Sequence, residues 1–216
     1  MAEIPSSGTR DLIELFVGYG AIIGTIWSPG HWQNILSPFV LVLTLGIILW
    51  RRPSRDDLGV GMRGLFASLW ILPAAIGLAA ASVFVAARLG TLHPLYHADT
   101  GHVMGYILWT IYQQVLLQDY FMPRLEPFFT NDAITVTVTG VLFAAAHLPN
   151  LVLVAATLVW GIVSCAVFRR YRNLWILGLA QGLLGLCFAV CVPDAMHHHL
   201  RVGLGYLRYR GGNILK

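Results

Sequence analysis

The chain is organised around the stretch YQQVLLQDY, residues 112–120, which places three glutamines and an aspartate inside an otherwise apolar run. A second apolar run ends in FAAAHLPN, residues 143–150, and carries a histidine near its end. Polar side chains at membrane depth are costly unless they face protein or a wet cavity, so they mark a site. We therefore expect the other segments of the chain to pack around these polar groups and enclose them.

The composition is that of a membrane protein. Of the 216 residues, 57% are hydrophobic and 11% are charged, whereas soluble domains carry roughly 25% charged residues. The length leaves no room for a sizeable soluble module beside one compact domain. The formal net charge is +4, but no basic run indicates nucleic acid, so we expect no nucleic-acid partner.

Seven segments are long and apolar enough to predict membrane helices. They are residues 11–27, 34–50, 64–87, 102–121, 133–147, 151–168 and 174–192. We therefore predict an all-α fold, a polytopic membrane helix bundle of about seven transmembrane helices that forms a single domain over residues 1–192. Residues 193–216 are too polar to span and form a polar C-terminal tail. Six and eight crossings stay open as alternatives.

The orientation follows from the basic residues in the short loops. Nine arginines fall on the side of the N-terminus: Arg10, Arg51, Arg52, Arg55, Arg63, Arg124, Arg169, Arg170 and Arg172. This predicts a multi-pass protein of the inner (plasma) membrane with a cytoplasmic N-terminus. Seven crossings then place the tail outside, although it carries Arg201, Arg208, Arg210 and Lys216. A re-entrant last segment is the alternative.

The polar groups of the predicted spans are expected to meet. Gln114 and Gln118 lie one helical turn apart on one face, with Gln113 about 100° to one side. Gln181 lies near the middle of the last span, and His147 lies at the outer end of the fifth. Hydrogen bonds between spanning helices are worth about 0.6 to 2 kcal/mol each. A purely structural role, in which these groups fix the packing, therefore stays open.

Two carboxylates also fall in predicted spans. Asp119 lies about 140° round the helix from Gln114, so we expect it to face elsewhere and to pair with Arg124. Glu14 lies in the first span and must pair or be protonated there. The three cysteines are interpreted as small core hydrophobes rather than a metal or redox site: Cys165, Cys187 and Cys191.

The histidines gather on one side of the predicted topology. All eight fall in the outer half or beyond: His31, His93, His97, His102, His147, His197, His198 and His199. Histidine is common at interfaces and in loops, which is the simpler interpretation. A pH-responsive or metal-binding outer surface is the alternative.

The order of the polar motifs resembles that of the CPBP (Abi, CAAX-protease-like) intramembrane proteases. That family usually carries Glu-Glu-x-x-x-Arg, then Phe-x-x-x-His, then His-x-x-x-Asn or Asp. Phe143 and His147 match the second motif outright, and the resemblance covers about residues 95–185. It implies a helical membrane endopeptidase in which a glutamate activates water for attack on a peptide bond, with help from histidines.

The chain departs from the family at the other motif positions. Gln113 and Gln114 stand where the family has two glutamates, and Gln118 stands where it has arginine. Gln181 stands at the second histidine, and Gly185 at the Asn or Asp. An amide has no titratable oxygen near neutral pH and cannot act as a general base. The resemblance therefore indicates a divergent member with Gln-Gln in place of Glu-Glu.

The resemblance also implies roles for individual residues. The positions equivalent to the family's catalytic residues are His147, Gln113, Gln114 and Gln181. The positions expected to contact substrate are Gln118, Phe143 and Asn150. A catalytic metal needs about three protein ligands, and this cluster offers one strong ligand, so we expect no metal and no cofactor.

Three functions fit these features. The first is a catalytically degenerate relative that acts as a membrane scaffold or binding subunit. The second is an active intramembrane endopeptidase that processes membrane or prenylated proteins through His147. The third is an enzyme acting on a lipid or prenyl group in the same cavity. In each case the expected partners are membrane lipids and another membrane protein, as substrate or as complex partner.

Overall fold

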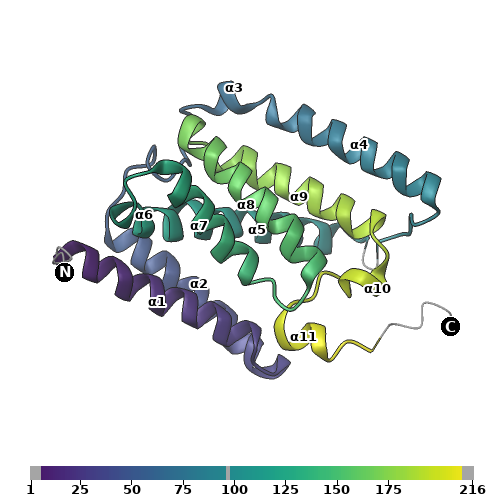
Figure 1. The fold of residues 1–216 in the computed structure, drawn as a ribbon, viewed down its shortest axis with the longest axis horizontal. Helices are drawn as coiled ribbons and strands as arrows, with labels where there is room; N and C mark the ends of the chain where they lie inside the picture. Colours follow the sequence, from purple (N-terminus) through teal and green to yellow (C-terminus); the bar gives the residue numbers. More distant parts are fainter. Residues whose placement is uncertain (1–5, 96–97, 211–216) are drawn as a thin grey trace.

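The computed structural model describes residues 6–95 and 98–210, and the regular structure in those residues is helical throughout (Figure 1). The first half contains α1 (Ser6–Ile26), α2 (Gly30–Trp50), α3 (Leu65–Ser68), α4 (Ile71–Leu89) and α5 (Thr100–Val115). A π-helix, η1 (Leu116–Phe121), then leads into α6 (Met122–Leu125) and a 3-10 turn, η2 (Glu126–Phe128). The second half contains α7 (Asp132–Ala145), α8 (Leu151–Tyr171), α9 (Leu174–Cys191), α10 (Asp194–His197) and α11 (Gly203–Leu207).

These helices form a membrane bundle, which confirms the predicted fold class. Four helices in the described ranges are long and apolar enough to cross a membrane: Gly30–Trp50, Leu65–Leu89, Leu151–Tyr171 and Leu174–Cys191. The helix Asp132–Ala145 is apolar but shorter. Helices also occupy the other predicted spans, as α1 and as α5 with η1. The protein is therefore a multi-pass membrane protein, and the count of seven crossings stays a prediction.

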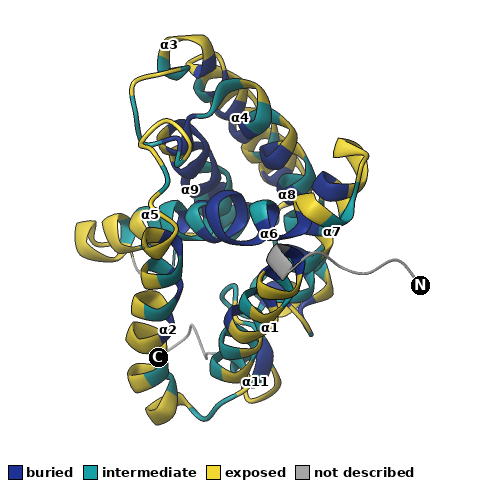
Figure 2. Ribbon diagram, turned by 90° about the vertical axis from the view of Figure 1, so that its left-hand side faces the viewer, coloured by how far each residue is buried: buried dark blue, intermediate teal, exposed yellow. Residues whose placement is uncertain are grey.

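The core surrounds the stretch that follows Tyr112. α4 packs on α9, α9 packs on α5, and α7 packs on α8, while α1 packs on α2 and on α6. The α1–α2 hairpin and α4 lie on opposite sides of the bundle (Figure 1). Buried residues are concentrated in η1, α6 and α9, the dark blue segments of Figure 2. Leu117, Tyr120 and Leu174 have no exposed surface, so η1 lies at the centre of the fold.

The third predicted span is interrupted, and the interruption has a local cause. α3 ends at Ser68 and α4 begins at Ile71, so Pro73 falls in the first turn of α4. Proline is tolerated there because the first amides of a helix have no intrahelical acceptor. The span predicted over residues 64–87 contains Pro73, which favours a kink. The structure breaks this span between α3 and α4, just before the proline.

Glycines bring α9 close to α5 and so position the site. A Cβ added at Gly178 would lie 2.9 Å from the Cα of Ile111, a contact that real side chains do not make. The hydroxyl of Thr110 donates to the Gly178 carbonyl at 3.0 Å across the same contact. Small residues allow such close approach between membrane helices. The approach places Gln181, on the next turn of α9, beside the glutamines of α5.

The C-terminal tail folds back onto the bundle rather than lying apart from it. The Asn150 amide donates to the carbonyls of His197 at 2.8 Å and Arg201 at 3.1 Å. The Gly203 amide donates to the Leu148 carbonyl at 2.8 Å. We call residues 193–209 the C-terminal cap, because they close the α7–α8 loop at the end of the bundle opposite the start of α1 (Figure 1). Residues 1–5, His97 and residues 211–216, with Lys216, lie outside the described residues.

A network of polar contacts holds the C-terminal cap. The Asp194 carboxylate accepts from the His199 backbone amide at 2.7 Å and from the Tyr209 hydroxyl. The His197 ring contacts the Val192 carbonyl through Nε2 at 2.9 Å and accepts from the Leu200 amide through Nδ1 at 3.1 Å. An Nδ1 that accepts cannot carry a proton, so this geometry requires neutral His197.

This requirement predicts that the C-terminal cap loosens in mild acid. Burial lowers the pKa of His197 below the ordinary 6.5, so the released cap binds protons more readily than the folded one. The stabilisation is complete above about pH 6.5 and decreases as the pH falls toward the pKa of the folded state. We expect backbone hydrogen exchange in residues 193–209 to accelerate between pH 7.5 and pH 5, after correction for intrinsic rates.

Two comparisons test this prediction. Asp194 does not contribute to the change, because hydrogen bonds keep its pKa below 3.8 even though burial opposes them; its contribution is lost only in stronger acid. The variant His197→Gln carries an amide that does not titrate in this range, so its exchange should respond less to pH than that of the wild type. His199, which pairs with Asp194 at 3.0 Å, still titrates in the variant. Equal pH responses in His197→Gln and the wild type would contradict the assignment.

Candidate functional site

Four glutamine side chains meet at the centre of the bundle and form one hydrogen-bonded series. The Gln118 amide donates to Gln114 Oε1 at 3.0 Å, and the Gln114 amide donates to Gln181 Oε1 at 2.6 Å. The Gln181 amide in turn donates to Gln113 Oε1 at 2.5 Å. The structure therefore joins η1, α5 and α9 through the four amides that the sequence singled out. We call these four residues the glutamine series.

An indole completes this series. Trp160 lies in the middle of α8, and its Nε1 donates to Gln181 Oε1 at 3.0 Å. Gln181 Oε1 thus accepts two hydrogen bonds, which fixes the orientation of its amide and hence the direction of the series. The sequence contained a signal for this contact, because a tryptophan in the middle of a span lies outside the usual interfacial belt.

The helix widens where the series begins. Residues Leu116–Phe121 form a π-helix between α5 and α6, and every residue of this turn is buried. Single π turns occur frequently at functional sites. Gln118 lies in this turn, and its amide bonds Gln114, four residues earlier in the chain.

One atom of the series lacks an ordinary partner. Gln118 Oε1 is buried and has no hydrogen bond of normal geometry among the described residues. At the other end, Gln113 is half-buried, and no residue in the described ranges accepts from its amide. The series therefore ends at a partly open amide.

His147 lies at the end of α7 beside the C-terminal cap, and it is 9% exposed. Its Nδ1 lies 2.7 Å from the Phe143 carbonyl, and its ring packs edge-on against the Phe143 ring. A carbonyl accepts, so Nδ1 carries the proton and Nε2 keeps its lone pair. No hydrogen bond joins His147 to the glutamine series in the part of the chain that the structure describes.

Phe143 and Asn150 connect His147 to the bundle. A Cβ added at Gly161 would lie 3.2 Å from the Phe143 ring, so this ring sits against α8 next to Trp160. The Asn150 amide is bonded to the C-terminal cap, and its Oδ1 accepts from the Leu153 amide at 3.1 Å as the N-cap of α8. Asn150 is fully buried. Its predicted contact with substrate stays a prediction.

The expected pairing of Asp119 with Arg124 is wrong. Arg124 is 1% exposed, and its guanidinium pairs with Glu14 of α1 at 2.8 Å. Arg124 reaches Asp119 only at the backbone carbonyl, at 3.3 Å. Asp119 is near Arg124 in the chain, whereas the actual partner, Glu14, lies 110 residues away. Neither Asp119 nor Glu14 shares a hydrogen bond with the glutamine series in the described residues.

The remaining candidates show no catalytic geometry. Cys165, Cys187 and Cys191 are free and buried. Among the residues that the structure describes, no group of three or more His, Cys, Asp and Glu side chains is arranged to hold a metal ion. The chemistry of the site is therefore that of neutral amides, one indole and one imidazole.

A comparison with known families matches the part of the chain that contains the glutamine series. The family model described as type II CAAX prenyl endopeptidase Rce1-like matches residues 58–187, more than half of the chain. The match begins well before the core predicted from the motifs, since it includes α3 and α4 as well as every member of the glutamine series. No curated protein and no solved structure matches the chain.

Proposed function

The chain belongs to the Rce1-like family of type II CAAX prenyl endopeptidases, and we propose that it has lost hydrolysis and acts as a membrane scaffold or binding subunit. The observation that supports this proposal is the glutamine series itself. By the motif resemblance, amides stand where the family has its glutamates, its arginine and its second histidine. These amides bond one another. A site whose polar groups are already paired favours packing and binding over proton transfer.

The chemistry of the amides is the main argument against hydrolysis. Attack of water on a peptide bond requires a group that takes up a proton, and such catalysis contributes roughly 10² to 10⁴ in rate. Gln113 and Gln114 cannot take up that proton near neutral pH. His147 could, but its Nδ1 is held by a backbone carbonyl and not by a carboxylate.

Gln113 is the group that we expect to bind a partner. It is half-buried at the open end of the series, and its Oε1 is already fixed by Gln181. Its amide N–H groups can therefore donate to a backbone carbonyl of a partner segment. A hydrogen bond of this kind between spanning helices is worth about 0.6 to 2 kcal/mol. We place the N-terminus in the cytoplasm of a plasma-membrane protein, as the arginine-rich loops indicate.

One observation favours an active endopeptidase as the second candidate. The hydrogen bond from Nδ1 to Phe143 leaves the lone pair of His147 Nε2 available as a base. A general base requires such an unprotonated ring nitrogen, which a neutral imidazole supplies. In that case cleavage would depend on His147 as the base, although no hydrogen bond joins it to the glutamine series in the described residues.

We expect the purified protein in proteoliposomes to cleave no prenylated CAAX reporter peptide above the level of His147→Ala. This follows because the amides cannot replace a base. Product formation is measured by mass spectrometry, and the melting temperature confirms that the variant is folded. Cleavage by the wild type that disappears in a folded His147→Ala variant would overturn the proposal and support the second candidate.

A crosslinking experiment tests the binding role directly. A photoreactive amino acid replaces Gln113 in one variant and Leu108 in a matched control, since Leu108 is on the same helix and is 64% exposed. We expect position 113 to give one protein adduct of discrete mass in native membranes. Lipid adducts at both positions, with no protein adduct at position 113, would contradict a scaffold that binds through the site.

A further inference from the structure

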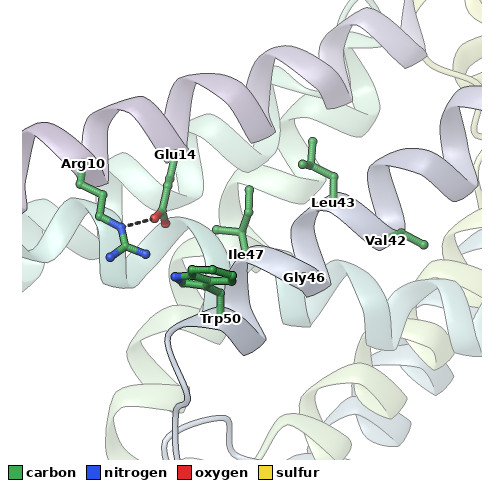
Figure 3. A pocket seen from close by; sticks show the side chains of 7 residues that line it. All are labelled: Arg10, Glu14, Val42, Leu43, Gly46, Ile47 and Trp50. Carbon is green, nitrogen blue, oxygen red and sulfur yellow. Dashed lines mark hydrogen bonds and ion pairs between the residues drawn. The ribbon is translucent and has the colours of Figure 1, made fainter.

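A crevice of about 460 Å³ opens between α1 and α2, near the start of α1. Figure 3 shows Arg10 and Glu14 of α1 on one side of it and the Trp50 ring of α2 on the other. The crevice is remote from His147. Leu148, the next residue, accepts a hydrogen bond from Gly203, and Gly203 packs against Ile26, at the far end of α1. The sixteen steps of helix from Arg10 to Ile26 span about 24 Å.

The floor of the crevice is apolar and open. Val42, Leu43 and Ile47 line it along α2. Gly46 lies between them, and a Cβ added there would meet no atom within 4 Å. A helix face of this shape presents a shallow trough that can hold a hydrocarbon chain.

The mouth of the crevice is polar and carries a surplus of positive charge. Arg10 donates through Nε to Glu14 at 2.8 Å, and its side chain is 54% exposed. Arg51 pairs with Asp11 and Glu14 and is 30% exposed. The buried guanidinium of Arg124 also binds Glu14, so three arginines share two carboxylates, those of Asp11 and Glu14. Because the Arg124 guanidinium is buried with Glu14 as its counter-ion, the surplus positive charge of this network falls on the exposed arginines, Arg10 and Arg51. Both of them line the polar hollow that adjoins the crevice.

The surroundings of the mouth are those of a membrane interface. Trp50 ends α2 and is 77% exposed, and tryptophan favours the headgroup level of a bilayer. Arg52 follows directly in the loop, so basic groups continue beyond the mouth. Anionic headgroups are attracted to such segments by about 1 kcal/mol for each basic residue.

We propose that this crevice binds one anionic phospholipid. Its phosphate lies at the mouth between Arg10 and Arg51, and one acyl chain lies along Val42, Gly46 and Ile47. Glu14 accepts a hydrogen bond from the Nε of Arg10, so the Nη groups of this arginine serve as donors to the phosphate. A second transmembrane helix is the competing occupant, but it would supply no charge to match the surplus at the mouth.

Native mass spectrometry of the full-length protein in a neutral detergent tests the proposal. Dioleoyl phosphatidylglycerol should give a one-to-one complex that dioleoyl phosphatidylcholine does not give at the same concentration. Arg10→Gln should weaken the phosphatidylglycerol complex about fivefold, the effect of one basic residue near a membrane surface. Gly46→Phe should abolish it, because the ring fills the trough.

Matched variants separate the crevice from general effects of charge and size. Gly77→Phe places the same ring on α4, where a Cβ also meets nothing within 4 Å. Arg88→Gln removes an arginine from the last turn of α4. Both controls should bind phosphatidylglycerol like the wild type.

Other outcomes would overturn the proposal. Equal binding of phosphatidylcholine, or wild-type affinity in either Arg10→Gln or Gly46→Phe, would exclude an anionic phospholipid in this crevice. Displacement of the lipid by inorganic phosphate alone would indicate a simple anion site. A dimer in place of the lipid complex, lost in Gly46→Phe, would indicate a helix as the occupant. If Gly46→Phe does not fold, the result for Arg10→Gln decides the question.

Discussion

The substitution Glu14→Ala should destabilise the protein by about 3 to 5 kcal/mol, because it leaves the Arg124 guanidinium buried without its counter-ion. Arg124 is 1% exposed and binds Glu14 through Nε at 3.0 Å and Nη2 at 2.8 Å. Its guanidinium also lies 3.9 Å from the centroid of the Tyr120 ring. A neutral ring attracts a cation but does not neutralise its charge. The free energy of unfolding is measured by denaturation with SDS in mixed micelles.

The matched control is Arg10→Ala, which removes an exposed partner of the same carboxylate. Arg10 is 54% exposed, so its loss should cost no more than about 1 kcal/mol. The double variant Glu14→Ala with Arg124→Leu should recover part of the stability, because a buried pair replaced by apolar groups leaves no unpaired charge. If Glu14→Ala costs no more than Arg10→Ala, Arg124 is hydrated and the network is not a buried ion pair.

Strong local patterns explain what the sequence could predict. Apolar runs of about 20 residues locate helices because each backbone polar group must be bonded inside a bilayer. The glutamines were predicted to meet for a related reason, since an amide in hydrocarbon needs a partner. Both predictions use only the free-energy cost of an unpaired polar group, and this cost depends on residue types that can be read from the sequence. The bonds between Gln114, Gln118 and Gln181 bear out this argument.

The features that the sequence did not predict depend on three-dimensional neighbours. Nothing near Arg124 in the chain indicates that its partner lies on α1. The π turn at Leu116–Phe121 likewise depends on packing, because its residues are ordinary helix formers. The C-terminal cap was expected to be a polar tail, and its folding requires the Asn150 amide to reach two carbonyls of the tail. A residue pattern cannot specify such long-range pairs.

The substitution Gln181→Leu should destabilise the bundle by about 2 to 4 kcal/mol, because it leaves several buried polar groups without partners. Gln181 accepts from Gln114 and Trp160 and donates to Gln113. Leucine has a similar volume, so lost packing adds little to the effect. The measurement is again denaturation with SDS, with circular dichroism to confirm that the helical content is unchanged.

A double-mutant cycle shows whether this loss comes from the glutamine series itself. Gln114→Leu and Gln181→Leu share one hydrogen bond of 2.6 Å, so the double variant should cost less than the sum of the single variants by about 0.6 to 1.7 kcal/mol. Gln33 provides the control, because it bonds the carbonyls of Ile26 and Ser28 in the α1–α2 turn. Gln33→Leu should add to Gln181→Leu within about 0.5 kcal/mol. If Gln114→Leu is equally additive, the amides are not coupled, and the series cannot be the paired, non-catalytic site on which the proposed function rests.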